Sequence, residues 1–466
     1  MTNNIELNTY LIHFFGDEVE CFFSADPENR AIRINSLKTN INEMMERLNQ
    51  LKVDFTGLSF NPLGFILHHD HIPLSHTLEF FQGYFQYQGI SSQIPALVLN
   101  PQPGERVLDI AAAPGSKSTQ IAALMRNQGQ LYLNDISKNR LQSLNVNVQR
   151  AGISNEIILN MAGERFGKLF PESFDKILVD APCTALGTLA GSPEVAEWWT
   201  YEKLKKLAIS QKQLLVSAFK ALKQGGELVY STCSIAPEEN EVIVQHLMEN
   251  YPIKVEEIPL KKLISCNDGL INYDGQNFDK NLSKAIRIFP HKHKMEGFFV
   301  IKLKKLNSQE KNNPVSVNWI PTLTHSDPLI KNELISLSQL WGIKKKYWNN
   351  YRYIVTKSRI WMLCGKIRQI PLERIHNAGL LLSEKRITGW KLTNQSVQFL
   401  GEEVRLRRIS LRDEQLQKLF SCGCLPILGL EYGYYILERE SKAIASVYCE
   451  KNNLQIRLPH AFRLAL

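Results

Sequence analysis

Residues 106–118 read RVLDIAAAPGSKS, and this stretch indicates the fold. An apolar strand is predicted to end at Asp109, a loop of small residues follows, and a helix begins near Lys117. Similar short apolar stretches recur at residues 129–135, 174–182 and 226–233. Helical patterns fill the intervals between them, and the last of these is expected to stop at Gly225 and Gly226. This alternation predicts an α/β fold with a parallel central sheet and helices on both faces.

The sequence before this core predicts a smaller unit within residues 1–75. A strand is expected at residues 31–37 and an amphipathic helix at residues 41–51. Thr39 or Asn40 is placed to cap that helix, because both side chains accept a hydrogen bond from a free backbone N–H group. We therefore expect a small α+β domain at this end of the chain.

A polar segment at residues 306–316 is typical of a linker, because it combines a proline with no apolar periodicity. Beyond it, strand-like segments recur at residues 396–401, 403–411, 433–438, 444–450 and 454–459. We therefore expect three domains, over residues 1–75, 76–305 and 317–466. The last is expected to be rich in β-structure and to form one unit or two small ones.

The charge of the chain is unevenly spread. Residues 301–466 carry 27 Lys and Arg against 13 Asp and Glu, a balance of +14, whereas residues 1–300 carry 28 against 33, a balance of −5. A region this basic is the electrostatic footprint of a polyanion binder, most often nucleic acid. Basic residues also mix with aromatic ones at Lys344–Trp348, around Trp361 and near Arg405–Arg408, which suits phosphate contact with base stacking. The alternative is a solvated basic face.

The composition excludes several classes of protein. Of 466 residues, 44% are hydrophobic and 22% charged, as in a globular chain rather than a disordered, collagenous or coiled-coil one. No apolar run reaches the length of about 18 residues that a transmembrane helix needs. The first residues lack the basic and apolar segments of a signal peptide. The eight cysteines are scattered without a CxxC pair, so neither a zinc site nor a disulfide framework is supported, and we expect a cytoplasmic protein.

One histidine run has the composition of a metal site. His68, His69, Asp70 and His71 are consecutive, with His76 nearby. Consecutive histidines rarely converge on one ion, and the usual ligand spacing is missing. We therefore expect no bound metal.

The candidate ligand-binding residues fall where strands are predicted to end. In an open parallel sheet, ligands bind beyond the carboxyl ends of the strands. Small residues after Asp109 let the backbone approach a ligand closely, and the following helix offers free N–H groups to an anion. Asp135 ends the next strand, about 20 residues further on, where a carboxylate accepts hydrogen bonds from ribose hydroxyls.

Two later strands end in residues with nucleophilic or acidic side chains. Asp180 and Cys183 close one strand, and Cys233 closes another just ahead of a predicted helix. A carboxylate such as Asp180 can bind the amino group or ring nitrogen of a base. A helix N-terminus lowers the pKa of a thiol and so favours a thiolate nucleophile at Cys233. Cys183 alone reads as a small buried side chain, but the three residues as a set favour a catalytic site.

These segments resemble the Nol–Nop–Sun family of RNA cytosine-5 methyltransferases. The matching segments are RINSLKTN (33–40), GISSQIPALVLNPQPGERVLDIAAAPGSKSTQIA (89–122), NDISKNR (134–140), FDKILVDAPC (174–183), GGELVYSTCSIAPEENE (225–241) and RIFPHKHKMEGFF (287–299). The similarity spans roughly residues 30–303, and the joint occurrence of DAPC and TCS is highly specific. The basic C-terminal region is similar in character to the extra RNA-binding domain of the longer family members.

The resemblance implies a class I, Rossmann-like methyltransferase that uses S-adenosylmethionine and acts on RNA, with 16S rRNA the expected substrate. It implies that Cys233 attacks C6 of a cytosine, that Asp180 holds or protonates the base at N3, and that Cys183 assists removal of the C5 proton. The cofactor residues it implies are Ala111, Ala112, Ala113, Pro114, Gly115, Ser116, Lys117, Asp135, Ala162 and Asp180. Gln88, Ser91 and Ser92 are expected to support the site from behind.

The chain departs from the family pattern at three places. Ala162 stands where the family usually has an aspartate that touches the adenine, so one cofactor contact is missing or Glu164 replaces it. Residues 184–194 differ from the family's substrate loop, and Gly89 stands where an acid is frequent. These departures keep two alternatives open. One is the same chemistry on tRNA, and the other is a catalytically impaired RNA-binding factor for ribosome assembly.

Overall fold

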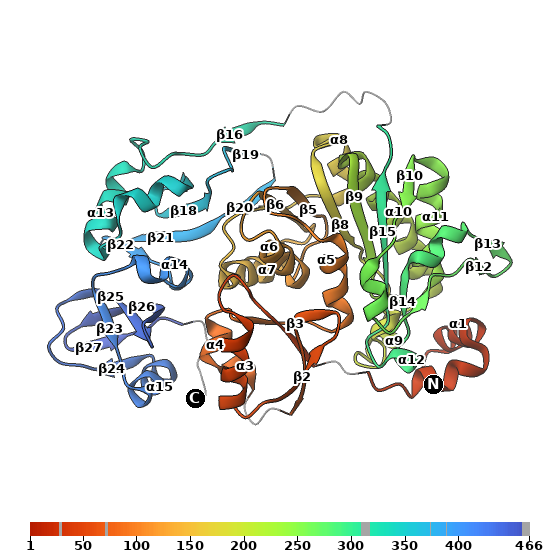
Figure 1. The fold of residues 1–466 in the computed structure, drawn as a ribbon, viewed down its shortest axis with the longest axis horizontal. Coiled ribbons are helices and arrows are strands. Elements are labelled where there is room, and N and C mark those ends of the chain that lie inside the picture. Colours follow the sequence, from red (N-terminus) through yellow and green to blue (C-terminus); the bar gives the residue numbers. More distant parts are fainter. Residues whose placement is uncertain (28–29, 70–72, 309–316, 373, 388, 459–466) are drawn as a thin grey trace.

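The computed structural model describes residues 1–458 apart from 28–29, 70–72, 309–316, 373 and 388. Most of the expected linker, along with Asp70 and His71, lies outside the described residues. A large central sheet carries a small N-terminal sheet below it and a group of C-terminal sheets beside it (Figure 1). Every helix within the described part of the chain is too short or too polar to cross a lipid bilayer.

The central sheet has ten strands in the order β11-β14-β15-β9-β8-β5-β6-β7-β20, with β10 also paired to β15. Its parallel core is β7-β6-β5-β8-β9, and β15 runs antiparallel to β9. The bounds are β5 Arg106–Asp109, β6 Gln130–Asn134, β7 Glu156–Leu159, β8 Phe174–Asp180, β9 Leu222–Thr232, β10 Ile253–Val255, β11 Asn267–Asp268, β14 Ile286–Ile288, β15 Phe298–Lys305 and β20 Ile375–Ala378. The predicted α/β class with a parallel-rich sheet is confirmed.

Helices cover both faces of this sheet because successive strand residues point to opposite sides. On one face, Ile177 and Val179 of β8 pack with helices α8 (Phe166–Leu169), α10 (Tyr201–Ala221) and α11 (Glu241–Asn250). On the other, Leu178 packs with α5 (Ile94–Leu99), α6 (Ser116–Leu124) and α7 (Lys138–Ala151). The expected helix stop at Gly225 and Gly226 is wrong, because α10 ends at Ala221 and the chain passes directly into β9.

The N-terminal sheet has the order β2-β3-β1-β4 and is antiparallel, with bounds β1 Ala31–Ile34, β2 Asp54–Leu58, β3 Asn61–His69 and β4 Phe85–Tyr87. Helix α3 (Ile41–Gln50) packs on it through Met44 and Leu48. The Asn40 side chain accepts the Glu43 N–H at 3.0 Å, which confirms the predicted cap. Strand β4 extends this sheet past residue 75.

Five helices and a small hairpin are the remaining α-helical and β-strand elements described in the N-terminal and central parts. Helices α1 (Ile5–Phe15) and α2 (Val19–Phe23) pack around Trp199 and Ile235 of the central domain rather than on the N-terminal sheet. The remaining elements are α4 Leu78–Phe81, α9 Val195–Trp198, α12 Pro290–His293, β12 Asn272–Tyr273 and β13 Gln276–Asn277.

The C-terminal region contains a two-stranded, a four-stranded and a five-stranded sheet, in the orders β16-β19, β17-β18-β21-β22 and β23-β25-β26-β27-β24. The strands are β16 Trp319–Pro321, β17 Tyr351–Val355, β18 Arg359–Cys364, β19 Gln369–Pro371, β21 Leu380–Arg386, β22 Gly389–Leu392, β23 Arg408–Ser410, β24 Cys424–Pro426, β25 Gly433–Arg439, β26 Lys442–Glu450 and β27 Asn453–Gln455. The helices are α13 Lys331–Trp341, α14 Asn394–Leu400 and α15 Asp413–Cys422. The predicted β-rich character of this region is confirmed.

One of the expected strands is a helix. Residues 396–401 lie in and just after α14, where the Thr393 side chain accepts the Ser396 N–H at 3.1 Å as an N-cap. Val397 and Leu400, three residues apart, are buried on one face of this helix. The prediction of a strand was therefore wrong, because the capping residue and the helical spacing of the buried side chains favour a helix.

The C-terminal region is built onto the rest of the molecule. Strand β20 pairs antiparallel with β7 at the edge of the central sheet. Leu78 and Phe81 of α4 belong to the same apolar cluster as Leu416 and Phe420 of α15. Ion pairs join α3 to the turn between β25 and β26, from Arg47 to Glu440 and from Lys442 to Glu43.

Candidate active site

The loops that follow β5, β6 and β7 are held together by Asn134. Its Nδ2 donates to the carbonyls of Ile110 and Met161, each at 3.0 Å, and its Oδ1 accepts the Met161 N–H at 3.1 Å. This fully buried amide fixes the carboxyl ends of three parallel strands in one place. Sequence reasoning named Asp135, the next residue, and missed Asn134.

The loop of small residues after β5 lies against α7. Gly115 has a φ of 107°, a left-handed conformation that favours glycine, and a Cβ there would also lie 2.9 Å from Leu144 Cδ1. The Asn147 side chain donates to the Pro114 carbonyl at 2.9 Å. Helix α6 then begins at Ser116, close to the predicted start. The predicted residues 111–117 thus form a tight turn that leads into a helix N-terminus.

Asp135 offers a free acceptor in a buried place. Its side chain is 2% exposed, and its Oδ1 accepts the Ser137 N–H at 2.9 Å. Its Oδ2 lies 3.2 Å from Arg140 Nη1 but has no hydrogen-bond donor within the described residues. The Arg140 charge stabilises this carboxylate, and its Oδ2 can still accept a hydrogen bond from a hydroxyl of a ligand.

Ala162 begins the turn after β7, beside Met161, and contributes no polar atom to the site. Glu164 is exposed, and its Oε1 accepts a hydrogen bond of 3.4 Å from Ser210 of α10. The structure therefore engages Glu164 with α10, and this contact lends no support to Glu164 as the replacement for the missing aspartate.

Asp180 is held by two neighbours at the end of β8. Its Oδ2 lies 2.8 Å from Lys117 Nζ, and its Oδ1 accepts a hydrogen bond of 2.8 Å from the Ser231 hydroxyl. Burial by itself lowers the pKa of Lys117, but the Asp180 carboxylate outweighs burial and leaves that pKa raised. The side chain of Asp180 is 28% exposed, so a ligand can still reach the ion pair.

The two predicted cysteines lie together. In the parallel pairing of β8 and β9, Asp180 is opposite Ser231, so Cys183 and Cys233 follow at the same edge of the sheet. Their Sγ atoms are 3.3 Å apart, and both residues are partly exposed. The hydrogen bond to Cys233, followed by burial, raises the pKa of Cys183 well above its usual value. The raised pKa favours the thiol form of Cys183, and either sulfur can act as the donor in the contact between them.

The side chain of Glu239 joins the two cysteine-bearing loops. Its Oε1 accepts the Thr184 N–H at 2.9 Å and the Gln211 side-chain amide at 3.0 Å, and the Thr184 hydroxyl donates to its other oxygen. Its backbone carbonyl accepts the Tyr230 hydroxyl at 2.6 Å. Thr184 follows Cys183 directly, so this buried carboxylate fixes the Cys183 loop against the segment that carries Cys233.

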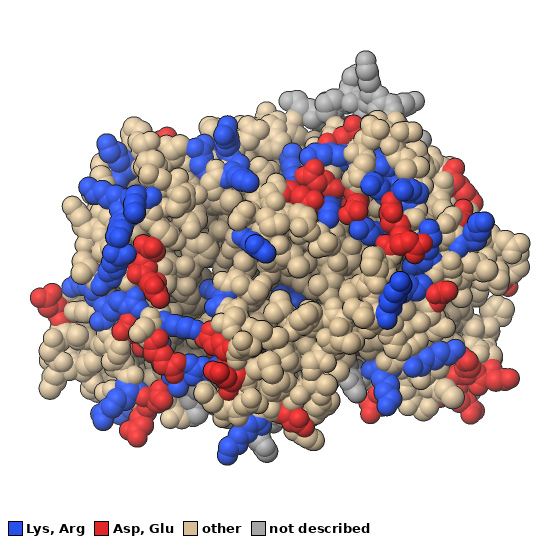
Figure 2. Space-filling model, in the orientation of Figure 1, with Lys and Arg blue, Asp and Glu red and all other residues tan. Residues whose placement is uncertain are grey.

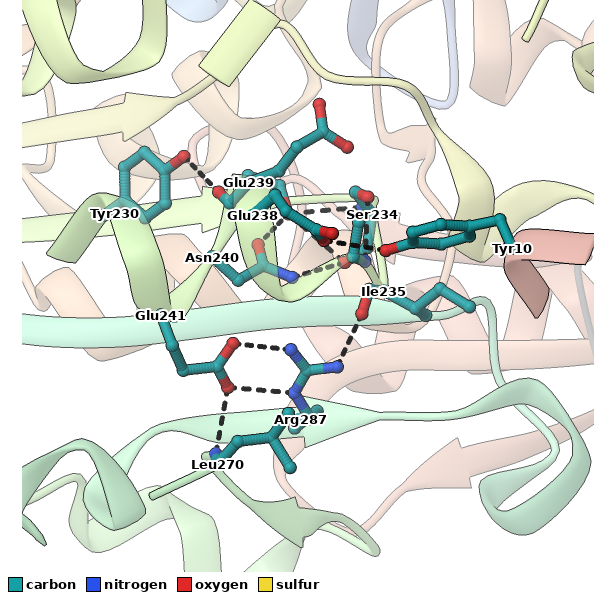
Figure 3. Close-up of polar contacts among 12 residues, drawn as sticks. Tyr10, Tyr230, Ser234, Ile235, Glu238, Glu239, Asn240, Glu241, Leu270 and Arg287 are labelled. Atoms are coloured by element: carbon teal, nitrogen blue, oxygen red, sulfur yellow. Dashed lines mark hydrogen bonds and ion pairs between the residues drawn. The ribbon is translucent and has the colours of Figure 1, made fainter. Parts of the chain in front are cut away.

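A buried ion pair anchors the other side of that segment (Figure 3). Arg287 Nε and Nη2 lie 3.0 and 2.6 Å from the two oxygens of Glu241, and both side chains are fully buried. Arg287 Nη1 also donates to the Ile235 carbonyl at 2.6 Å. A bidentate pair of this kind fixes geometry as well as charge. Sequence reasoning missed its role, although both residues lie in the segments that carried the family resemblance.

The residues expected to support the site lie behind the cofactor loop. Gln88 Nε2 donates to Ser92 O and to Gln120 Oε1 of α6, each at 2.9 Å. Its Oε1 accepts the buried Arg33 Nε at 2.7 Å. The Ser91 hydroxyl donates to the Glu296 carbonyl at 2.6 Å. The N-terminal sheet is thereby bonded to the helix that begins at the candidate site.

Several of the expected RNA-contacting residues have structural partners. Trp348 is buried, and its indole N–H donates to the Ser338 hydroxyl at 2.8 Å. Arg407 and Arg408 pair with Glu431 and Glu438 at 3.4 and 2.5 Å. Lys344, Lys345 and Lys346 are without such a carboxylate partner in the described part of the chain and are mostly exposed.

Comparison with known proteins is consistent with this arrangement. A family model described as 16S rRNA methyltransferase RsmB/F matches residues 96–304. Ribosomal RNA small subunit methyltransferase F of Escherichia coli O81 (strain ED1a) is 32% identical over 416 residues, which cover 84% of this chain and 85% of that one. The protein of the same name from Vibrio campbellii (strain ATCC BAA-1116) is 38% identical over 288 residues, covering 61% of this chain and 58% of that one.

Two solved structures from Pyrococcus horikoshii share the fold. A methyltransferase homologue is 34% identical with a TM-score of 0.58, covering 64% of this chain and 93% of that one. NSun6, solved with SFG, an analogue of S-adenosylmethionine, is 26% identical with a TM-score of 0.56, covering 65% of this chain and 98% of that one.

Proposed function

This chain belongs to the RsmB/F family of S-adenosylmethionine-dependent 16S rRNA methyltransferases, and we propose that it methylates C5 of a cytosine through a covalent bond between Cys233 and C6 of the ring. The observation that carries the proposal is the Cys183–Cys233 pair, with sulfur atoms 3.3 Å apart. The pair lies at the ends of adjacent strands beside the Asp180–Lys117 ion pair. The substrate proposed is 16S rRNA.

The first step uses Cys233 as a nucleophile. The thiolate sulfur forms a bond to C6, and the C5=C6 π electrons move toward C5, which then carries the nucleophilic electron pair. Asp180 holds or protonates the base at N3 and draws charge from the ring, in a site where the Lys117 charge is close at hand. Covalent attack divides one difficult substitution into two easier steps.

S-adenosylmethionine, when bound, supplies the electrophilic methyl group. Residues 111–117, Asp135, Ala162 and Asp180 would hold it, and the buried Asp135 Oδ2 without a donor is the feature of this chain that fits its ribose. After C5 has taken the methyl group, the C5 proton leaves to solvent water with the assistance of Cys183. The electrons of the C5–H bond reform C5=C6, and the bond from Cys233 to C6 breaks.

Base pairing and stacking hide C6 from a nucleophile, so the target cytosine is single-stranded or flipped out of its helix when it reacts. We propose that the basic region over residues 317–466 binds RNA while the domain over residues 76–305 performs the chemistry. The N-terminal residues 1–75 are proposed as a smaller RNA-binding unit.

The test is methyl transfer from labelled S-adenosylmethionine to 16S rRNA and to tRNA, with nucleoside mass spectrometry of the product. We expect 5-methylcytosine in 16S rRNA for the wild type and none for Cys233→Ala. Activity that survives Cys233→Ala would show that Cys233 is not the nucleophile. Label found in tRNA alone would show that tRNA, and not 16S rRNA, is the substrate.

The alternative of an impaired assembly factor is motivated by Ala162. A hydrogen bond lost from a ligand weakens affinity by up to about tenfold, which leaves the cofactor bound but less tightly. Calorimetry separates the two: no detectable binding at millimolar S-adenosylmethionine would favour the assembly factor.

A further inference from the structure

A cavity of about 460 Å³ lies between two sheets of the C-terminal region, away from the candidate active site. One wall comes from the hairpin β21–β22, with Lys385, Arg386 and Lys391. The other comes from β25, β26 and the end of the chain after β27, with Tyr434, Ser446, Tyr448 and Arg457. Lys and Arg side chains are plentiful on this side of the molecule (left in Figure 2).

The cations of this cavity are only partly neutralised. Arg386 pairs with Glu384 at 2.6 Å. Lys385, Lys391 and Arg457, by contrast, have no carboxylate within ion-pair distance among the residues that the structure describes. Burial, and then the charge of Arg386, lower the pKa of Lys391. Like charges gathered in a partly buried place favour a bound anion, because an anion relieves their mutual repulsion.

Three tyrosine side chains form a cluster at the same place. The rings of Tyr434 and Tyr448 have centroids 4.7 Å apart, and Tyr432 packs edge-on against Tyr448 at 5.4 Å. Lys391 Nζ lies 5.8 Å from the centre of the Tyr434 ring. Tyr432 is 60% exposed, and Tyr434 and Tyr448 are partly exposed. Accessible rings beside cations are what a nucleobase and its phosphate require of a protein surface.

Ser446 gives an independent indication of a ligand. It lines the cavity from β26, is 2% exposed, and its hydroxyl has no hydrogen-bond partner in the described residues. Its backbone N–H has its own partner in the Asn394 side chain at 2.9 Å, so the hydroxyl is the donor of this residue that lacks one. A buried hydroxyl without a partner is costly unless a ligand supplies one.

We propose that this cavity binds one nucleotide of single-stranded RNA, with the phosphate on Lys391 and Arg457, the base against Tyr434 and Tyr448, and Ser446 bonded to a polar atom of the nucleotide. The proposal rests on RNA being the substrate, and it assigns to the C-terminal region a definite point of contact outside the catalytic site. Duplex RNA is excluded from such a contact because its bases are already stacked on one another.

The experiment measures binding of the full-length protein to a fluorescently labelled single-stranded RNA and to its duplex, without cofactor. We expect Lys391→Ala and Tyr448→Leu each to weaken single-strand binding about tenfold, with the salt dependence of Lys391→Ala reduced by about one ion. Tyr448→Phe keeps the ring and should stay within about twofold of the wild type. Lys391→Gln and thermal unfolding of each variant guard against misfolding.

The matched control is Lys418→Ala, which removes the same charge from the exposed face of α15 in the same region. The proposal is overturned if Lys391→Ala weakens binding no more than Lys418→Ala does, since the contact would then be diffuse attraction. It is also overturned if inorganic phosphate displaces the RNA as well as uridine monophosphate does, which would mark a free-anion site. Because no methyl transfer is measured, failure here is distinct from failure of the proposed chemistry.

Discussion

Cys183 and Cys233 are chemically different although their sulfur atoms are in contact. The contact with Cys233 and burial raise the pKa of Cys183 well above its usual value, and either sulfur can donate across the pair. This asymmetry suits one nucleophile and one proton-transfer group, as the proposed reaction requires. The positions of both were predictable, because residues that end parallel strands meet at one edge of the sheet.

The residues that fix this pair were not predictable in the same way. Asn134, Glu239 and Arg287 act through partners that are far away in the sequence, or through loops whose meeting depends on the finished fold. Periodicity and strand ends identify which side chains reach the site. They carry no information about which buried polar group satisfies which loop.

Glu239 is the first of these to test. Glu239→Gln turns one acceptor oxygen into an N–H₂ group that faces donors from Thr184 and Gln211. We expect a loss of roughly 1–3 kcal/mol in the free energy of unfolding and a fall of at least about tenfold in kcat, because the Cys183 loop loses its anchor. Glu238→Gln is the control, since its contact is a hydrogen bond from Tyr10 that a side-chain carbonyl can still accept. Equal losses of stability and kcat in the two variants would contradict the role of Glu239 as the anchor of the Cys183 loop.

Asp109 makes stability depend on pH. Burial raises the pKa of this carboxyl to about 7, despite the Ser118 hydroxyl that donates to it at 2.7 Å. Between about pH 4 and 7 the folded chain therefore holds a proton here that the unfolded chain has released, and stability falls as the pH rises, by up to roughly 4 kcal/mol. Asp109→Asn should abolish this part of the slope in urea unfolding. The same slope in both proteins would show that Asp109 is ionised when folded.

Strand β20 shows how an element of the C-terminal region reaches the cofactor side of the molecule. The Arg374 carbonyl, just before this strand, accepts the Asn160 N–H at 2.8 Å. Asn160 in turn donates to the carbonyls of Asp135 and Ile136 at 2.8 and 2.9 Å. Two hydrogen bonds thus connect the residue before this edge strand to the backbone of Asp135, whose side chain is the proposed ribose-binding carboxylate.

Gln149 of α7 is the place to test this coupling. Its side chain donates to Gly379 O and accepts Leu381 N–H, each at 2.9 Å, so both ends of its amide hold the junction between β20 and β21. Gln149→Ala should weaken S-adenosylmethionine binding several-fold, about 1 kcal/mol by calorimetry, since the support behind Asp135 loosens. Val146→Ala on the same helix is 52% exposed and should change nothing. An unchanged affinity of Gln149→Ala for S-adenosylmethionine would mean that β20 stabilises the fold without influencing the cofactor site.

The strands of the central sheet were predicted correctly from the sequence. Among the strands predicted in the C-terminal region, some are present and one is a helix. The central strands are short apolar runs that alternate with long helices, and this alternation indicates a parallel sheet rather than another fold class. Residues 396–401 form a helix because Thr393 caps them and Val397 and Leu400 share a buried face. In a run this short, β-branched composition cannot separate a strand from a helix.

The distribution of charge over the whole molecule distinguishes the basic C-terminal region from the rest of the chain. The surplus of +14 lies within residues 301–466, whereas the proposed chemistry lies within residues 76–305. Yet β20, the α4–α15 contact and the ion pairs of α3 join these regions into one body. The uneven charge was visible in the sequence, but the docking was not, because it depends on contacts between distant segments.

Salt should therefore act on RNA and cofactor differently. Raising KCl from about 50 to 200 mM should weaken RNA binding by about a hundredfold or more if about six phosphates are contacted. The reason is that binding releases cations from the RNA phosphates, and this release is less favourable at high salt. S-adenosylmethionine affinity, measured by calorimetry in parallel, should change far less. An equally shallow salt dependence for both ligands would contradict RNA binding by the basic region.

The most direct test of the covalent mechanism is to trap the intermediate. Cys183→Ala leaves Cys233 free to attack but removes the group proposed to assist its release, so incubation with 16S rRNA and S-adenosylmethionine should give a protein–RNA adduct that survives denaturing electrophoresis. After nuclease and protease digestion, mass spectrometry should find the methylated cytidine on the peptide that contains Cys233. The double variant Cys183→Ala, Cys233→Ala should give no adduct. A nucleotide bound to another residue, or an adduct that persists in the double variant, would contradict the account.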